Sequence, residues 1–181
     1  MISKKIFFII FLQFSLFANS VYNINFLDFQ AKVFPKIILL DNNFEDKLLE
    51  NSVVLTILYE EIDYSVVESL KDKIEKEYKS LKDYNLKVNS LKYSEFNINK
   101  LSTAYILLLG KDEKILEISK ILSSNSRLTF AYDNSYLDLG VIFGLSITSK
   151  VDILLNIEAL KNSKIELQNS IFSVVKIRWE I

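Results

Sequence analysis

The chain has 181 residues, of which 50% are hydrophobic and 25% charged, with a net charge of −1 and neither histidine nor cysteine. This composition indicates one folded domain with a sizeable core and excludes a disordered chain. Without histidine and cysteine, imidazole and thiolate chemistry is excluded for catalysis and for metal binding. The charge is balanced and the basic residues are dispersed, so no nucleic acid partner is expected. We therefore expect a binding protein, not an enzyme, with no cofactor and no metal.

Residues 1–20 have the pattern of an export signal. Two lysines precede a mostly apolar run from Ile6 to Phe17, and small residues follow it. The run is shorter than the roughly 20 residues that span a bilayer, so we expect cleavage after Ser20, or alternatively after Ala18, and not a retained anchor. The mature domain, residues 21–181, is accordingly expected outside the cytoplasm.

The mature chain begins with closely spaced apolar residues from Ile24 to Leu40, which are typical of a buried helix. Pro35 is expected to end or kink this helix, because its ring removes a helical hydrogen bond and biases Phe34 away from helical geometry. Ile37 to Leu40 is then expected to start a strand. A turn and one short helix are expected between residues 41 and 51.

From Ser52 onward, strand patterns alternate with helix patterns. Ser52 to Tyr59 is a continuous β-branched and apolar run, typical of a strand buried on both faces. Tyr64 to Leu81 has apolar residues spaced by helical turns. Further strands are expected at 86–93, 104–109 and 128–132, and a further helix at 113–122. This alternation predicts an α/β domain with a mostly parallel sheet flanked by helices.

The last third of the chain departs from this alternation. Val141 to Thr148 and Val151 to Asn156 are separated by only two residues, which predicts a β-hairpin. Helical patterns follow at 158–161 and 165–176. Because no linker or repeat divides the chain, the sequence predicts a single α/β domain that ends in a β-hairpin and a terminal helix.

The candidate ligand-binding residues lie in one loop, at the end of a predicted strand. Two aromatic residues, Tyr132 and Tyr136, flank three polar ones that include Asp133 and Asn134. Such a loop can stack a planar ligand and form hydrogen bonds with it. The alternative is an ordinary turn, which favours the same residue types.

Two other positions have the location of a binding site without a decisive motif. Gly110 closes a predicted strand, but no phosphate-binding motif surrounds it, which favours an ordinary strand-to-helix turn. Glu60, Glu61 and Asp63 follow the central strand, where ligands bind in open α/β sheets. The helix dipole also favours acidic residues at a helix start, so a structural role is the alternative.

The segment from residue 125 to 177 resembles the closing segment of the YfiR/HmsC-type periplasmic regulator family. Gly140 matches a glycine that starts a family strand, and Lys150-Val151 matches the turn that follows. Leu154 to Ile157 matches a strand end that contains an asparagine. Ile165 to Val175 matches the last helix of the family. A second glycine, adjacent to the first in relatives, is absent here.

The resemblance implies a non-catalytic periplasmic protein that binds and restrains the periplasmic part of an inner-membrane signalling protein, either a diguanylate cyclase or a sensor kinase. It also implies structural roles for Gly140 and Asn156, and asparagine is a favoured helix cap. Disulfide control of relatives cannot operate without cysteine. The alternative function is a periplasmic small-ligand binding protein with Tyr132 to Tyr136 in its pocket. A homodimer is left open.

Overall fold

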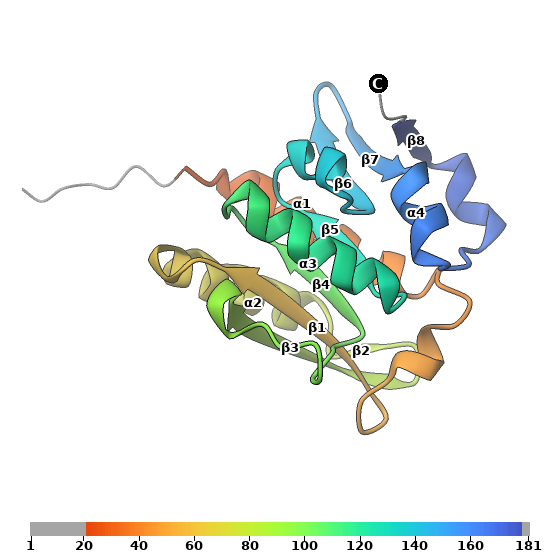
Figure 1. The fold of residues 1–181 in the computed structure, drawn as a ribbon, viewed down its shortest axis with the longest axis horizontal. Helices are drawn as coiled ribbons and strands as arrows, with labels where there is room; N and C mark the ends of the chain where they lie inside the picture. The colour runs from red at the N-terminus through yellow and green to blue at the C-terminus, as the bar shows by residue number, and fades with distance from the viewer. Residues whose placement is uncertain (1–20, 179–181) are drawn as a thin grey trace, which may run out of the picture.

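The computed structural model describes residues 21–178, so the expected signal peptide at 1–20 lies outside the described residues. One eight-stranded sheet runs through the molecule in the order β2-β3-β1-β4-β5-β6-β7-β8 (Figure 1). The strands are β1 (Ser52–Tyr59), β2 (Ser80–Leu81), β3 (Tyr84–Lys92), β4 (Ala104–Leu107), β5 (Leu128–Ala131), β6 (Phe143–Ile147), β7 (Val151–Asn156) and β8 (Val175–Arg178). The helices are α1 (Ile24–Ile38), α2 (Tyr64–Glu77), α3 (Asp112–Ser124) and α4 (Ile157–Ser163).

The sheet is mostly parallel, which confirms the predicted α/β class. Strands β3, β1, β4, β5 and β6 run parallel to one another, whereas β2 is antiparallel to β3 and β7 is antiparallel to β6. The predicted C-terminal hairpin is the β6–β7 pair. Among residues 21–178, none of the helices has the length and apolar character that crossing a membrane needs.

Strand β1 is the centre of the fold, and its whole length is buried. It pairs with β3 along all eight residues and with β4 along four. Helices α1 and α2 pack on one face of the sheet and α3 on the other, which gives two separate clusters of buried apolar residues (Figure 1). The continuous apolar run of β1 follows from this arrangement, because both faces of the strand are covered.

Helix α1 continues through Pro35 to Ile38, so the expected break at Pro35 and the expected strand from Ile37 are wrong. The proline ring costs α1 one hydrogen bond close to its C-terminal end, where little helix remains to be disrupted. Phe34 is fully buried and stacks on Phe130 of β5, with ring centroids 4.6 Å apart. Burial of this face against the sheet outweighs the local preference.

The segment from 165 to 176, expected to be a helix, is only partly helical. A 3-10 helix covers Asn169–Ser173, and the chain then forms β8, a strand that the sequence did not predict. β8 pairs in parallel with β7, and the Lys176 ammonium lies 2.6 Å from the Asp152 carboxylate of that strand. The short apolar pattern around Ile171 fits a helix and an edge strand equally well, and only pairing with β7 decides between them.

Gly140 and Asn156 have structural roles on either side of the hairpin. Gly140 ends the 3-10 helix at Asn134–Leu139 with φ at +89°, a conformation that glycine adopts without strain. The Asn156 side chain accepts a hydrogen bond from Ala159 N–H at 2.9 Å and so caps α4. Its amide nitrogen donates to the Leu137 carbonyl at 2.6 Å. Asn156 therefore joins α4 to the segment that precedes β6.

Replacing Asn156 with alanine should lower the free energy of unfolding by about 2 kcal/mol, since a cap and a buried hydrogen bond are both lost. Urea denaturation of the mature chain measures this difference. Asn162→Ala is the matched control, because Asn162 is exposed on the same helix; its effect should stay below about 0.5 kcal/mol. Equal effects of the two substitutions would contradict the role given to Asn156.

Candidate functional site

An open α/β sheet ordinarily binds its ligand at the carboxyl ends of the two strands between which the strand order reverses. In this protein, tyrosine side chains fill that position. Here those strands are β1 and β4. Three tyrosine hydroxyls bond the backbone directly after β4: Tyr93 donates to the Leu108 carbonyl at 2.7 Å, Tyr22 accepts from Leu109 N–H at 2.9 Å, and Tyr136 accepts from Gly110 N–H at 2.8 Å. We call these three residues the tyrosine cap.

Two of the three acidic residues that follow β1, Glu61 and Asp63, are committed to neighbouring side chains. Tyr22 donates to the Asp63 carboxylate at 2.8 Å, and the Glu61 carboxylate lies 2.6 Å from the Lys92 ammonium. Within residues 21–178, no cluster of three or more acidic side chains could hold a metal ion. Gly110 joins β4 to the loop before α3, and a Cβ at this position would meet the Tyr93 ring at 2.8 Å. The crevice is therefore filled by protein.

Burial raises the pKa of each cap hydroxyl. The pKa of Tyr93 lies well above its ordinary value, mainly because its ring is buried. Burial also raises the pKa of Tyr22, and the hydrogen bond to Asp63 raises it further. Burial raises the pKa of Tyr136, while its backbone hydrogen bond at Gly110 opposes the shift. The cap therefore stays protonated at neutral pH.

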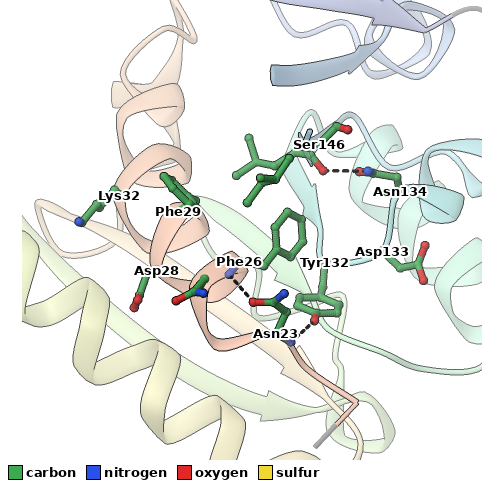
Figure 2. Close-up of a pocket in the computed structure, with 12 residues that line it drawn as sticks. Asn23, Phe26, Asp28, Phe29, Lys32, Tyr132, Asp133, Asn134 and Ser146 are labelled. Carbon is green, nitrogen blue, oxygen red and sulfur yellow. Dashed lines mark hydrogen bonds between the residues drawn. The ribbon is translucent and has the colours of Figure 1, made fainter. Parts of the chain in front are cut away.

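A groove of about 840 Å³ lies beside this cap, between α1 and the chain from β5 to β6 (Figure 2). Its apolar wall consists of Phe26, Phe29, Tyr132, Leu145 and Ile147. Its polar lining consists of Asn23, Asn25, Asp28, Lys32, Asp133, Asn134 and Ser146. The groove is more polar than most small-molecule sites, but its aromatic rings can stack a ligand, and its volume lies within the usual range.

Three of the four candidate loop residues line the groove. Tyr132 packs its ring on Phe26 and accepts a hydrogen bond from Asn23 N–H at 2.8 Å (Figure 2). Asn134 donates to the Leu145 carbonyl at 2.8 Å, and its Oδ1 is buried without a hydrogen-bond partner. Asp133 accepts from Ser135. The loop thus brings an aromatic ring and a carboxylate to one end of the groove, while the Asn134 amide is directed at β6.

Tyr136, the fourth candidate, lies elsewhere. It is buried in the tyrosine cap and lines no part of the groove. The 3-10 helix from Asn134 rotates the side chain away from Tyr132, so the two rings of the loop cannot hold one ligand between them. Stacking between Tyr132 and Tyr136 is therefore not how this loop would bind.

The sequence did not reveal the α1 side of the groove. Phe29 belongs to an apolar run that indicated a buried helix, yet 38% of its surface is exposed to the groove. Ile147 faces it from β6 and is 42% exposed. A large apolar residue on the exposed face of a helix is a useful signal, but the sequence alone does not show which side of α1 the sheet leaves uncovered.

Charges of both signs lie at the rim. Asp28 is paired with Lys73 of α2 and is thereby neutralised. The Lys32 ammonium has no ion-pair partner within the described part of the chain. Figure 2 shows Lys32 and Asp133 on opposite sides of the groove. The groove therefore offers one unpaired cation and one carboxylate at separate positions, with aromatic surface between them.

No family model matches the chain, and no curated protein is significantly similar to it. Solved structures resemble its fold. The crystal structure of a conserved domain protein from Vibrio cholerae O1 biovar El Tor has a TM-score of 0.53 at 12% identity, covering 85% of this chain and 60% of that one. The structure of the ABC domain from Streptococcus pneumoniae in complex with L-Trp has a TM-score of 0.50 at 10% identity, covering 78% and 62%. The chain thus spans about three fifths of the length of these structures, and the likeness shows the fold alone.

The free energy of unfolding should fall as the pH rises above about 10, the ordinary tyrosine pKa. Tyrosines of the unfolded chain lose their protons there, whereas Tyr22, Tyr93 and Tyr136 keep theirs in the fold because their pKa values are raised. The unfolded state then binds fewer protons than the native state, which lowers stability. Urea denaturation at a series of pH values, with tyrosinate absorbance recorded in parallel, measures the effect. Complete ionisation of all tyrosines near pH 10 in a chain that stays folded would contradict the cap.

Proposed function

We propose that the chain is an exported binding domain whose groove between α1 and β6 takes a small zwitterionic molecule with an aromatic or aliphatic group, such as an amino acid or a short peptide. The observation that carries this proposal is the composition of the groove: a wall of aromatic and aliphatic residues with Lys32 and Asp133 on opposite sides. A ligand carboxylate would pair with Lys32, and a ligand ammonium would pair with Asp133.

The exposed apolar side chains of the groove support the choice of ligand. Phe29 of α1 and Ile147 of β6 both line the groove and are about two fifths exposed. An amino acid with a large side chain would cover this apolar surface and remove it from water.

The fold likeness adds support of a limited kind. One of the similar structures, the pneumococcal ABC domain, was solved with L-Trp. The sequence identity of 10% transfers no ligand residue to this chain. The likeness in fold makes L-tryptophan a reasonable first probe, because its indole ring suits an aromatic wall and its amino and carboxylate groups are charged.

Calorimetric titration of the mature chain with L-tryptophan, and then with the other amino acids and with dipeptides, tests the proposal. We expect binding of at least one of them at micromolar to millimolar concentration. Phe29→Ala should weaken that binding about threefold to tenfold, because one aromatic contact contributes about 0.5–1.5 kcal/mol. Lys32→Gln should weaken binding of the zwitterion while leaving an uncharged analogue unaffected.

Phe172→Ala is the matched control for Phe29→Ala. Phe172 is exposed to a similar extent, 42%, and does not line the groove. Its removal should leave the affinity unchanged. The proposal fails if no amino acid or dipeptide binds, or if the two phenylalanine variants weaken binding equally.

A second candidate function is restraint of an inner-membrane signalling protein, a diguanylate cyclase or a sensor kinase, through its periplasmic part. The supporting observation is an exposed apolar surface beside the tyrosine cap. Ile62 is 89% exposed and Ile24 66% exposed, and the Tyr22–Asp63 hydrogen bond draws their two segments together. Exposed apolar clusters of this kind are frequent at protein–protein contacts.

For this second function, the tagged mature chain should recover one inner-membrane protein with a periplasmic domain from a detergent-solubilised envelope. Ile62→Asp should abolish that recovery, because the charge would be buried in the contact. Ile98→Asp serves as the control, since Ile98 is also exposed but belongs to the loop before β4. Recovery of soluble enzymes only, or equal loss in both variants, would exclude restraint through this surface.

A further inference from the structure

A second hollow, of about 630 Å³, lies at the amino-terminal end of the parallel strands, and Arg127 is part of its wall. Arg127 directly precedes β5, and its backbone N–H bonds the Leu122 carbonyl at 2.9 Å at the end of α3. Lys87 and Asn89 reach the hollow from β3, and the loop before β4 contributes Lys100. None of these residues lines the groove beside α1, so the two hollows are separate.

The Arg127 guanidinium has no acceptor. Its Nε and Nη1 atoms are buried without a hydrogen bond, and the described part of the chain supplies none to Nη2 either. A charged group removed from water without a partner costs several kcal/mol. Consistent with this, burial lowers the pKa of Arg127, and only Tyr105 and Asp41 act against the shift.

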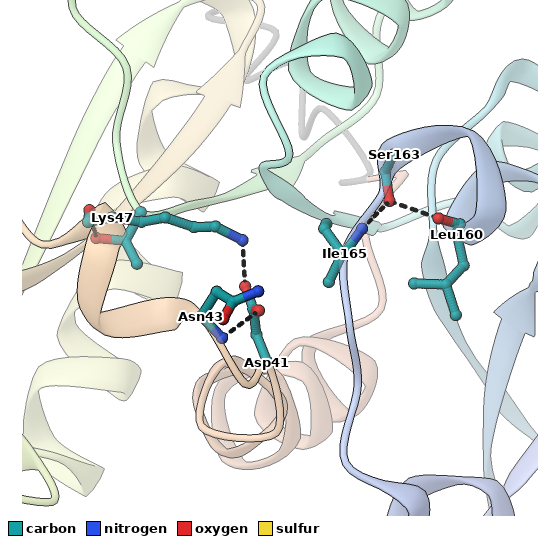
Figure 3. Close-up of polar contacts among 7 residues, drawn as sticks. Asp41, Asn43, Lys47, Leu160, Ser163 and Ile165 are labelled. Atoms are coloured by element: carbon teal, nitrogen blue, oxygen red, sulfur yellow. Dashed lines mark hydrogen bonds and ion pairs between the residues drawn. The ribbon is translucent and has the colours of Figure 1, made fainter.

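The carboxylate whose charge acts on Arg127 is already engaged. Asp41, which follows α1, accepts from the Lys47 ammonium and from Asn43 N–H (Figure 3). Only 1% of the Asp41 side chain is exposed. Its charge is therefore balanced by Lys47, and the charge of Arg127 remains uncompensated.

The lining of the hollow is basic as a whole. Lys87, Lys100 and Arg127 stand against one carboxylate, that of Glu50. Glu50 is paired with Lys87 at 3.1 Å, and the Lys100 ammonium has no ion-pair partner within residues 21–178. Two cations are thus left over, next to the polar side chains of Asn89, Asn99 and Ser102.

We propose that this hollow is a second ligand site, which binds an oxyanion of charge −2 or more, as in a phosphate ester or a polycarboxylate. Arg127 would donate to the oxyanion from Nη2, the guanidinium nitrogen that is not among its buried atoms. Lys100 adds an unpaired charge at the mouth of the hollow, where it is exposed to arriving anions. A bound oxyanion would thereby supply the acceptor that the guanidinium lacks.

Thermal unfolding of the mature chain in sodium phosphate, and in trisodium citrate, against sodium chloride of equal ionic strength tests the proposal. One of the two multivalent anions should raise the Tm by about 5 °C or more at saturation. Which of them acts distinguishes a phosphate site from a polycarboxylate site. If neither raises the Tm beyond the chloride reference, the proposal is wrong.

Arg127→Met should abolish the anion effect and, without anion, should have a Tm equal to or above that of the natural chain, because an unpaired buried charge is gone. Lys100→Gln should weaken anion binding about threefold to tenfold in calorimetry, and it decides the question if Arg127→Met does not fold. Lys120→Gln, an exposed lysine on α3 outside the hollow, should change nothing. Undiminished anion binding in Lys100→Gln or in folded Arg127→Met would overturn the proposal.

Discussion

The tyrosine cap on the backbone after β4 closes the crevice in which an open α/β sheet ordinarily binds its ligand. That crevice lies at the carboxyl ends of the strands where the strand order reverses. Here Tyr22, Tyr93 and Tyr136 fill it and use the polar groups of residues 108–110 that a ligand would otherwise meet. Tyr22 precedes α1, so the cap also fixes the start of that helix. Both proposed ligand sites therefore lie elsewhere, one beside α1 and the other at the amino-terminal ends of the strands.

The two hollows proposed as ligand sites differ in their chemistry. The groove along α1 combines aromatic surface with single charges of either sign, whereas the hollow around Arg127 is basic and has no aromatic residue in its wall. A protein with both could respond to two kinds of ligand. Sheet strands connect them, since β5 begins directly after Arg127 and ends directly before Tyr132. Strand β5 is buried along its whole length. Any coupling between the groove and the Arg127 hollow would therefore involve the side chains and loops at the two ends of β5.

The sequence predicted the class of fold because its strongest signals are local. β1 was expected at its observed bounds, because the seven apolar or β-branched residues from Val53 to Tyr59 form a continuous run that is typical of a buried strand. Pro35 and β8 were mistaken because burial against the sheet and pairing with β7 decide those segments, and both are long-range. Tyr132, Asp133 and Asn134 were proposed as ligand-binding residues because they share one loop, and that loop does line the groove. The positions of Phe29 and Arg127 depend instead on which surface the neighbouring elements leave open. From the sequence, Arg127 is a single basic residue before an apolar strand, and nothing in the sequence indicates that it lacks an ion-pair partner.

Chemical-shift mapping of the ¹⁵N-labelled mature chain during titration with L-tryptophan, or with whichever amino acid binds best, tests the central claim most directly. The account predicts that the largest changes occur at the amides of Asn25, Phe29, Asn134 and Ser146, while those of Leu109 and Gly110 stay in place under the tyrosine cap. Large changes at Leu109 and Gly110, with the groove amides unmoved, would mean that the cap opens to admit the ligand, and would contradict the account.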